Sequence, residues 1–124
     1  MYLLIDNSPN DKIILYYCLD TDWIQSQYER DNRSLMEIVE NLLLSINKKL
    51  PDLQGLAVVV GKGKFTATRI ATTLVNTLSF ALKIPVVAVD DFNPNLIKEI
   101  KASPVGQYVS AQYSAPANIG GVKQ

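Results

Sequence analysis

Residues 56–92 constrain the fold more than any other part of this 124-residue chain. The apolar run 56–60 lies between two glycines, which is typical of a short strand buried on both faces. Apolar residues then recur at helical spacing, and Pro85 must end that helix before the second apolar strand, 86–89. A strand, a helix and a strand in this order predict two parallel strands with a right-handed crossover. The predicted apolar stripe of the helix comprises Ala67, Ile70, Ala71, Leu74, Leu78, Ala81 and Leu82.

Three further strands and a helix precede this unit. Residues 2–5, 12–19 and 23–29 are rich in β-branched and aromatic residues, and turn-forming residues separate them, so they predict an antiparallel meander. Ser34 followed by Glu37 is a capping-box pattern that predicts the start of a helix. The apolar face of that helix comprises Leu35, Ile38, Val39, Leu42, Leu43 and Ile46. The sequence therefore predicts an α/β fold of order βββαβαβ, with helices packed on a mixed sheet.

Length and composition indicate a single domain. A chain of 124 residues that is 48% hydrophobic can bury a core large enough for one domain but has no room for two domains. We expect residues 1–103 to form this domain and residues 104–124, in which prolines and glycines break any long element, to form an extended tail. Tyr108, Val109 and Tyr113 leave open the alternative that the tail docks as a strand on this sheet or on a partner.

Charge and residue usage exclude several kinds of site. The 12 basic and 12 acidic residues balance, so non-specific binding to nucleic acid is not expected to dominate. The sequence contains no histidine, which excludes the usual serine triad and removes the commonest metal ligand. The single cysteine, Cys18, cannot form an internal disulfide and is predicted to be a buried structural thiol. We therefore expect neither a metal nor a cofactor.

Two groups of polar residues leave their role open. Gly61, Lys62, Gly63 and Lys64 do not have the spacing of a phosphate-binding P-loop, yet they could offer amides and lysines to an anion at a helix N-terminus. The alternative is a tight turn with solvated lysines. Asp6, Asp90 and Asp91 follow predicted strands, where such sheets place functional groups, but turn formation or helix capping explains them equally well.

The residues after the first parallel strand resemble a known family. Gly61, Gly63, Phe65, Thr66, Arg69, Ile70, Ile84 and Pro85 match the loop, helix and second strand of the TsaB (YeaZ) family, whose members help make threonylcarbamoyladenosine in tRNA. Residues 3–8 resemble its opening strand, and Tyr113, Pro116, Asn118 and Ile119 resemble the tail of some members. Lys62, Lys64, Ala67 and Ala71 depart from the pattern, and residues 92–112 stand where the family carries a second lobe.

The resemblance implies a single actin/Hsp70-like (ribonuclease H-like) lobe. It further implies a non-catalytic subunit that binds and stabilises a TsaD-type enzyme, with a TsaE-type ATPase as another candidate partner, a homodimer when alone, and only indirect contact with tRNA. A degenerate actin-like nucleotide hydrolase or protease, or a free-standing homodimeric interaction module, are the alternatives. Self-contained ATPase activity is not expected, because that class grips nucleotide between two lobes and the turn at residues 7–10 has no glycine for phosphate approach.

The resemblance also predicts where a partner binds. TsaB-like proteins use the two helices of this lobe, which implies partner contacts from Phe65, Thr66, Arg69, Ile70, Thr73, Leu74 and Thr77, and from Leu35, Ile38 and Leu42 on the first helix. Thr66 also has a local role available as the helix N-cap. The alternative is that the apolar stripe faces the chain's own sheet. No apolar stretch reaches the length of a membrane span and no signal sequence follows Met1, so we expect a cytoplasmic protein without membrane contact.

Overall fold

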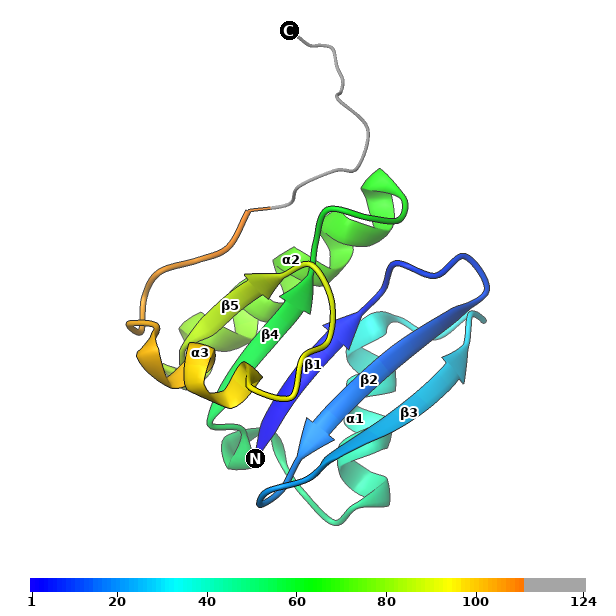
Figure 1. Cartoon of the computed structure of the whole chain (residues 1–124). Helices are drawn as coiled ribbons and strands as arrows, with labels where there is room; N and C mark the ends of the chain where they lie inside the picture. Colours follow the sequence, from blue (N-terminus) through cyan, green and yellow to red (C-terminus); the bar gives the residue numbers. More distant parts are fainter. Residues whose placement is uncertain (111–124) are drawn as a thin grey trace, which may run out of the picture.

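The computed structural model describes residues 1–110 (Figure 1). Its centre is a five-stranded sheet with the strand order β3-β2-β1-β4-β5. Strands β1 (Tyr2–Asp6), β2 (Lys12–Cys18) and β3 (Trp23–Glu29) form the predicted antiparallel meander. Strands β4 (Gly55–Val59) and β5 (Val86–Val89) run parallel to β1. The predicted mixed sheet and the predicted order of elements are therefore confirmed.

Helices cover both faces of the sheet. The described residues form α1 (Leu35–Ser45), the short 3₁₀-helix η1 (Leu50–Asp52), α2 (Phe65–Leu82) and α3 (Leu96–Ala102). Figure 1 shows α1 and α2 behind the sheet and α3 in front of it. The larger core lies beneath α1 and α2, and a smaller one lies beneath α3.

Strand β1 contributes to both cores. Leu3 and Ile5 point into the larger core and Leu4 into the smaller one, and all three are fully buried. On the smaller side Phe92 stacks on Tyr16 of β2, with ring centroids 4.5 Å apart, and meets Trp23 edge-on at 5.7 Å. The loop before α3 thus covers the part of the sheet that α3 leaves open.

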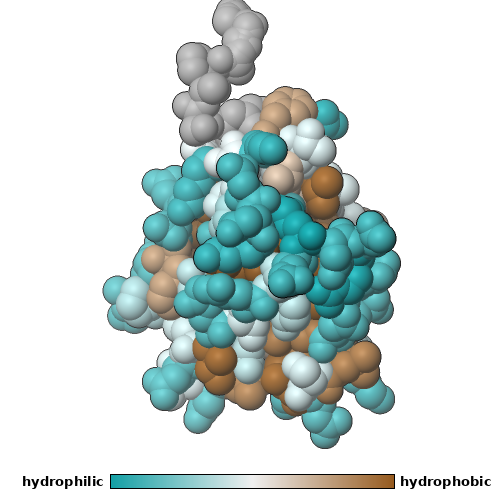
Figure 2. Space-filling view, turned by 90° about the vertical axis from the view of Figure 1, so that its right-hand side faces the viewer, coloured by the Kyte–Doolittle hydropathy of each residue, from teal (hydrophilic) through white to brown (hydrophobic). Residues whose placement is uncertain are grey.

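The edge strand β3 is polar. Gln25, Gln27 and Glu29 are exposed, and Figure 2, which views the molecule from the side on which β3 lies, shows a largely hydrophilic surface. Polar side chains on an unpaired edge discourage pairing with the strands of other chains.

The starts of the two long helices differ. The Ser34 hydroxyl accepts a hydrogen bond from the Glu37 amide at 3.1 Å, which confirms Ser34 as the N-cap of α1. The N-cap of α2 is Lys64, without a capping side chain, so the prediction that Thr66 is the N-cap was wrong. Thr66 already lies within the first turn, because Gly63, at φ +80°, completes the turn before the helix earlier than predicted.

The buried face of α2 is rotated from the predicted apolar stripe. Of that stripe only Ala71 and Leu78 are buried, and Ile70 is 48% exposed. Hydroxyl side chains take the remaining buried positions with Val75, and each donates a hydrogen bond to a backbone carbonyl: Thr68 to Lys62, Thr72 to Arg69 and Ser79 to Ile84. Burying a hydroxyl costs little when it is hydrogen-bonded, so three polar residues share the inner face with Ala71, Val75 and Leu78 while Ile70 remains outside.

The described part of the predicted tail contains a turn at residues 105–106 and forms neither helix nor strand. Asn76 of α2 holds it, because its side-chain nitrogen donates to the Val109 carbonyl at 2.9 Å and its oxygen accepts from the Val109 amide at 2.9 Å. Tyr113, Pro116, Asn118 and Ile119 lie outside the described residues. None of the helices within residues 1–110 is long and apolar enough to cross a membrane.

Gly55 sets how closely α3 approaches the sheet. A Cβ atom there would overlap Cγ2 of Ile100 and lie 3.0 Å from Cδ1 of Tyr2. Gly55→Ala is therefore expected to lower the free energy of unfolding by about 1–3 kcal/mol, the usual cost of overpacking a core. Urea unfolding measures this. In an Ile100→Ala background the added cost should fall, because the overlapping methyl group is gone, and an equal cost in both backgrounds would contradict the packing argument.

Candidate partner-binding groove

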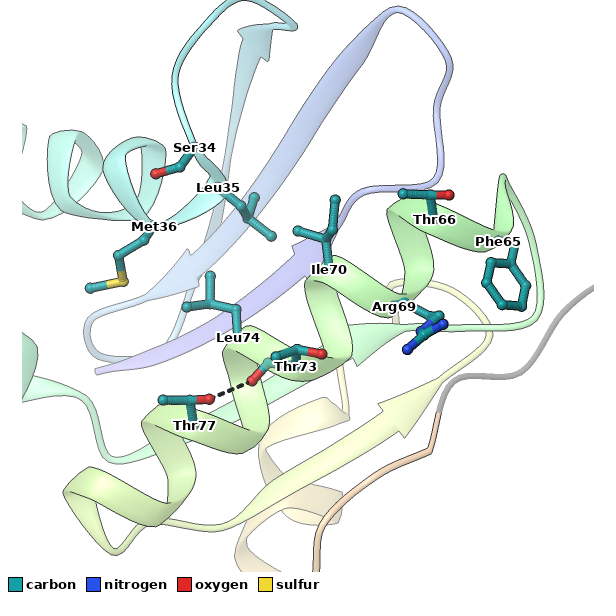
Figure 3. A pocket seen from close by; sticks show the side chains of 10 residues that line it. All are labelled: Ser34, Leu35, Met36, Phe65, Thr66, Arg69, Ile70, Thr73, Leu74 and Thr77. Atoms are coloured by element: carbon teal, nitrogen blue, oxygen red, sulfur yellow. Dashed lines mark hydrogen bonds between the residues drawn. The ribbon is translucent and has the colours of Figure 1, made fainter.

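A groove of about 560 Å³ runs between the start of α1 and the outward face of α2 (Figure 3). Positions three and four residues apart on α2 form one wall, since they share one side of a helix. Figure 3 shows Leu35, Ile70 and Leu74 directed into the space between the two helices. The groove is lined by Ser34, Leu35, Met36, Phe65, Thr66, Arg69, Ile70, Thr73, Leu74 and Thr77.

The groove is apolar and carries a single charge. Phe65 is 53% exposed and Ile70 48% exposed, which leaves large apolar side chains at the surface. Arg69 is the one charged residue among the described lining residues, and its guanidinium carbon lies 5.3 Å from the centre of the Phe65 ring. At this distance the ring face attracts the cation. Arg69 thus stays beside the groove with its nitrogen donors accessible to a second molecule.

The structure brings together most of the predicted contact residues. All seven on α2 line the groove, and so does Leu35 of α1. Ile38 and Leu42 do not, because they are 0% and 1% exposed in the core, and their place in the predicted contact set is corrected. Their apolar face on α1 packs against the chain's own sheet, which was the open alternative for such a stripe.

Two lining residues, Ser34 and Met36, were missed in the sequence. The sequence identified Ser34 only as a helix N-cap, and Met36 falls outside the predicted apolar face of α1. The groove is formed by the first turn of α1 rather than by its length. Its place as the second residue after the N-cap was the one available signal for Met36.

The hairpin between β1 and β2 supports the first turn of α2. A Cβ atom at Gly63 would lie 2.7 Å from Cα of Ser8, so these two loops are in close contact. The Asn7 side chain donates to the Ala67 carbonyl at 3.0 Å. Arg30, just after β3, donates to the carbonyls of Asn7 at 2.6 Å and Pro9 at 2.8 Å. Three segments of the chain thus meet at this end of the groove.

The charged residues near the loops are engaged locally. The buried Asp6 carboxylate accepts hydrogen bonds from the Ser8 amide at 3.0 Å and the Ser8 hydroxyl at 2.5 Å, which is turn chemistry. Lys62 pairs with Asp91 at 3.4 Å. The predicted anion site at residues 61–64 stays a prediction.

Nearer α1, a hydrogen bond from the Arg33 side chain lowers the pKa of Asp31, and the two side chains pair at 2.9 Å.

Residues 1–110 contain no cluster of three or more histidine, cysteine or acidic residues that could hold a metal ion. Cys18 is buried at 1% exposure, as predicted, and burial raises the pKa of its thiol. A raised pKa keeps the thiol protonated and unreactive near neutral pH. Within the described part of the chain the groove is therefore a better candidate for function than any titratable group.

Comparison with known proteins agrees with this fold. Residues 28–115 match the family model described as "TsaD: tRNA N6-adenosine threonylcarbamoyltransferase". A protein of that description from Chromobacterium violaceum is 30% identical over 76 residues, which cover 61% of this chain. YeaZ from Pseudomonas aeruginosa superposes with a TM-score of 0.64 at 28% identity over 73% of this chain. A structure described as an uncharacterized protein with similarity to peptidase YEAZ, from the same organism, gives the same values.

The matched relatives are longer proteins. The chain spans 22% of the Chromobacterium violaceum protein and 43% of each Pseudomonas aeruginosa chain. The family match nevertheless covers more than half of this chain, and the fold is the actin-like one of YeaZ. The chain therefore belongs to the TsaD family, as a TsaB (YeaZ)-like member.

Proposed function

We propose that this chain is a non-catalytic subunit that binds and stabilises a TsaD-type enzyme in the formation of threonylcarbamoyladenosine in tRNA. The observation that carries the proposal is the groove between α1 and α2, where Phe65 and Ile70 remain about half exposed beside Arg69. Exposed apolar side chains gathered in one hollow mark interaction sites on otherwise polar surfaces. The family match supplies the reaction in which the partner works.

The absence of catalysis is part of this proposal. Asp6, at the end of β1, directs its carboxylate to Ser8, and the turn that follows has no glycine. A nucleotide phosphate would find neither a close backbone approach nor a free carboxylate there. We assign the chemistry to the TsaD-type partner, and contact with tRNA to the complex as a whole. A TsaE-type ATPase is a further candidate partner.

A second candidate is self-association through the same groove when the partner is absent. The exposed Phe65 and Ile70 favour it, because an apolar face without a partner is covered by a second copy at sufficient concentration. The two candidates are compatible, because the same face would form the homodimer when the partner is absent and the complex when it is present.

Arg69→Ala is expected to weaken binding of the TsaD-type protein at least thirtyfold, which corresponds to about 2 kcal/mol, if Arg69 is an anchor of the interface. Its planar guanidinium can donate several hydrogen bonds at once, so its loss should exceed that of a typical surface charge. Calorimetric titration of the folded variant measures the affinity. Lys101→Ala removes an exposed positive charge on α3, on the other side of the sheet, and serves as the matched control. Equal affinities of both variants would contradict the role of Arg69.

The isolated protein is expected to show no ATP turnover above background. A phosphate-release assay with purified protein tests this, and calorimetric titration with ATP tests binding separately. Asp6→Asn, which keeps an acceptor for Ser8 but removes the charge, is the control. Turnover that persists through purification and disappears in this variant would overturn the assignment as a non-catalytic subunit.

A further inference from the structure

A second hollow continues the groove along α2. It has a volume of about 450 Å³ and is lined by Asn76, Thr77, Phe80 and Tyr108. Thr77 lines both spaces, so the two are neighbours along α2. Phe80 is 72% exposed and Tyr108 51% exposed, although both are large aromatic residues. The exposed surface therefore extends past the groove to the C-terminal part of α2 and to the segment after α3.

The contacts of Val109 hold Tyr108 at this place. Figure 1 shows the segment after α3 returning past β5. Asn76 binds both polar groups of the Val109 backbone, at 2.9 Å each, as a neighbouring strand would. Val109 also packs against the larger core. These contacts fix Tyr108, the residue before Val109, beside Phe80.

We propose that the hollow between Phe80 and Tyr108 is the second half of the partner-binding surface, and that one amphipathic helix of the TsaD-type partner covers both halves. The proposal rests on the function proposed above and extends it to Asn76, Thr77, Phe80 and Tyr108. Asn76 lines the hollow, but both polar groups of its side chain bind the Val109 backbone, so we assign it as a positioning residue for Tyr108.

The shape of α2 favours a helix as the occupant. From Arg69 to Phe80 the helix rises about 16 Å, which three turns of a partner helix would cover. Thr73 and Thr77 are short and lie between the bulkier Ile70 and Phe80, so a second helix can approach closely at the middle of this face. The bulky side chains at either end can then pack against those of the partner.

The charge of the surface constrains the partner further. Arg69 is the one charged residue among the described residues that line the groove and the hollow. The complementary helix should therefore have an apolar contact face with one carboxylate opposite Arg69 and none near Phe80. A basic face would place like charges together at Arg69, and an all-polar one would leave Phe80 and Tyr108 uncovered.

The first test needs no partner. Hydrogen exchange of the Val109 amide, followed by NMR, is expected to be about tenfold faster in Asn76→Ala than in the wild type, because the amide loses its acceptor. Amides in β1 serve as the internal control for global stability. An unchanged rate at Val109 would overturn the positioning role of Asn76.

The second test measures affinity for the full-length TsaD-type protein encoded in the same genome. Phe80→Ala and Tyr108→Ala are each expected to weaken binding about tenfold or more. Leu44→Ala, which truncates a side chain of α1 that is 76% exposed and lines neither space, should bind like the wild type. If Asn76 acts through Tyr108, adding Asn76→Ala to Tyr108→Ala weakens binding no further.

The outcomes separate this inference from the proposed function. If Arg69→Ala weakens binding while Phe80→Ala and Tyr108→Ala behave like Leu44→Ala, the groove binds the partner and the extension is wrong. If the wild type does not bind the TsaD-type protein at all, both proposals are overturned. Full additivity of Asn76→Ala and Tyr108→Ala would contradict the positioning role alone.

Discussion

Three hydroxyl side chains on the inner face of α2 set the rotation of this helix about its axis, and the rotation determines which of its side chains are exposed. Thr68, Thr72 and Ser79 are buried because backbone carbonyls accept their hydrogen bonds. Unsatisfied, each would cost about 1–3 kcal/mol, enough to favour a different rotation of the helix. With them inside, Ile70 and Leu74 turn toward α1, and Arg69 and Thr73 toward solvent. The groove, its single charge and its continuation to Phe80 all follow from that rotation.

Periodicity in the sequence predicted the elements but not this rotation. The order of elements along the chain, the Ser34 cap and the parallel pairing of β4 and β5 follow from local patterns of apolar and turn residues, and the structure confirms them. A stripe counted from apolar residues alone places Ile70 inside, because it treats threonine and serine as surface residues. The sequence does not reveal which hydroxyl will find a carbonyl at the right distance. For Thr68 and Ser79 that choice depends on the positions of Lys62 and Ile84, outside the helix, whereas Thr72 donates to Arg69 within it.

The candidate site was predicted better on α2 than on α1. The motif shared with the TsaB family contains Phe65, Thr66, Arg69 and Ile70, and all four line the groove. On α1 no motif was available, and apolar periodicity selected Ile38 and Leu42, which the core requires. The pairing of Asn76 with Val109 joins residues 33 positions apart through a side chain. A contact of this kind produces no periodic pattern in the sequence, so local patterns could not predict it.

The hydrogen bonds of Arg30 and Asn7 connect the hairpin between β1 and β2 to the wall of the groove, although the hairpin does not line it. Arg30 connects the end of β3 to the hairpin, and Asn7 connects the hairpin to the first turn of α2. The hairpin, the end of β3 and the start of α2 are therefore connected by hydrogen bonds. Ile70 lies in the part of α2 that these bonds hold in place. A change in this hairpin is therefore expected to alter the position of Ile70 in the groove. The effect of a substitution at Ile70 is therefore expected to depend on which residues occupy positions 7 and 30.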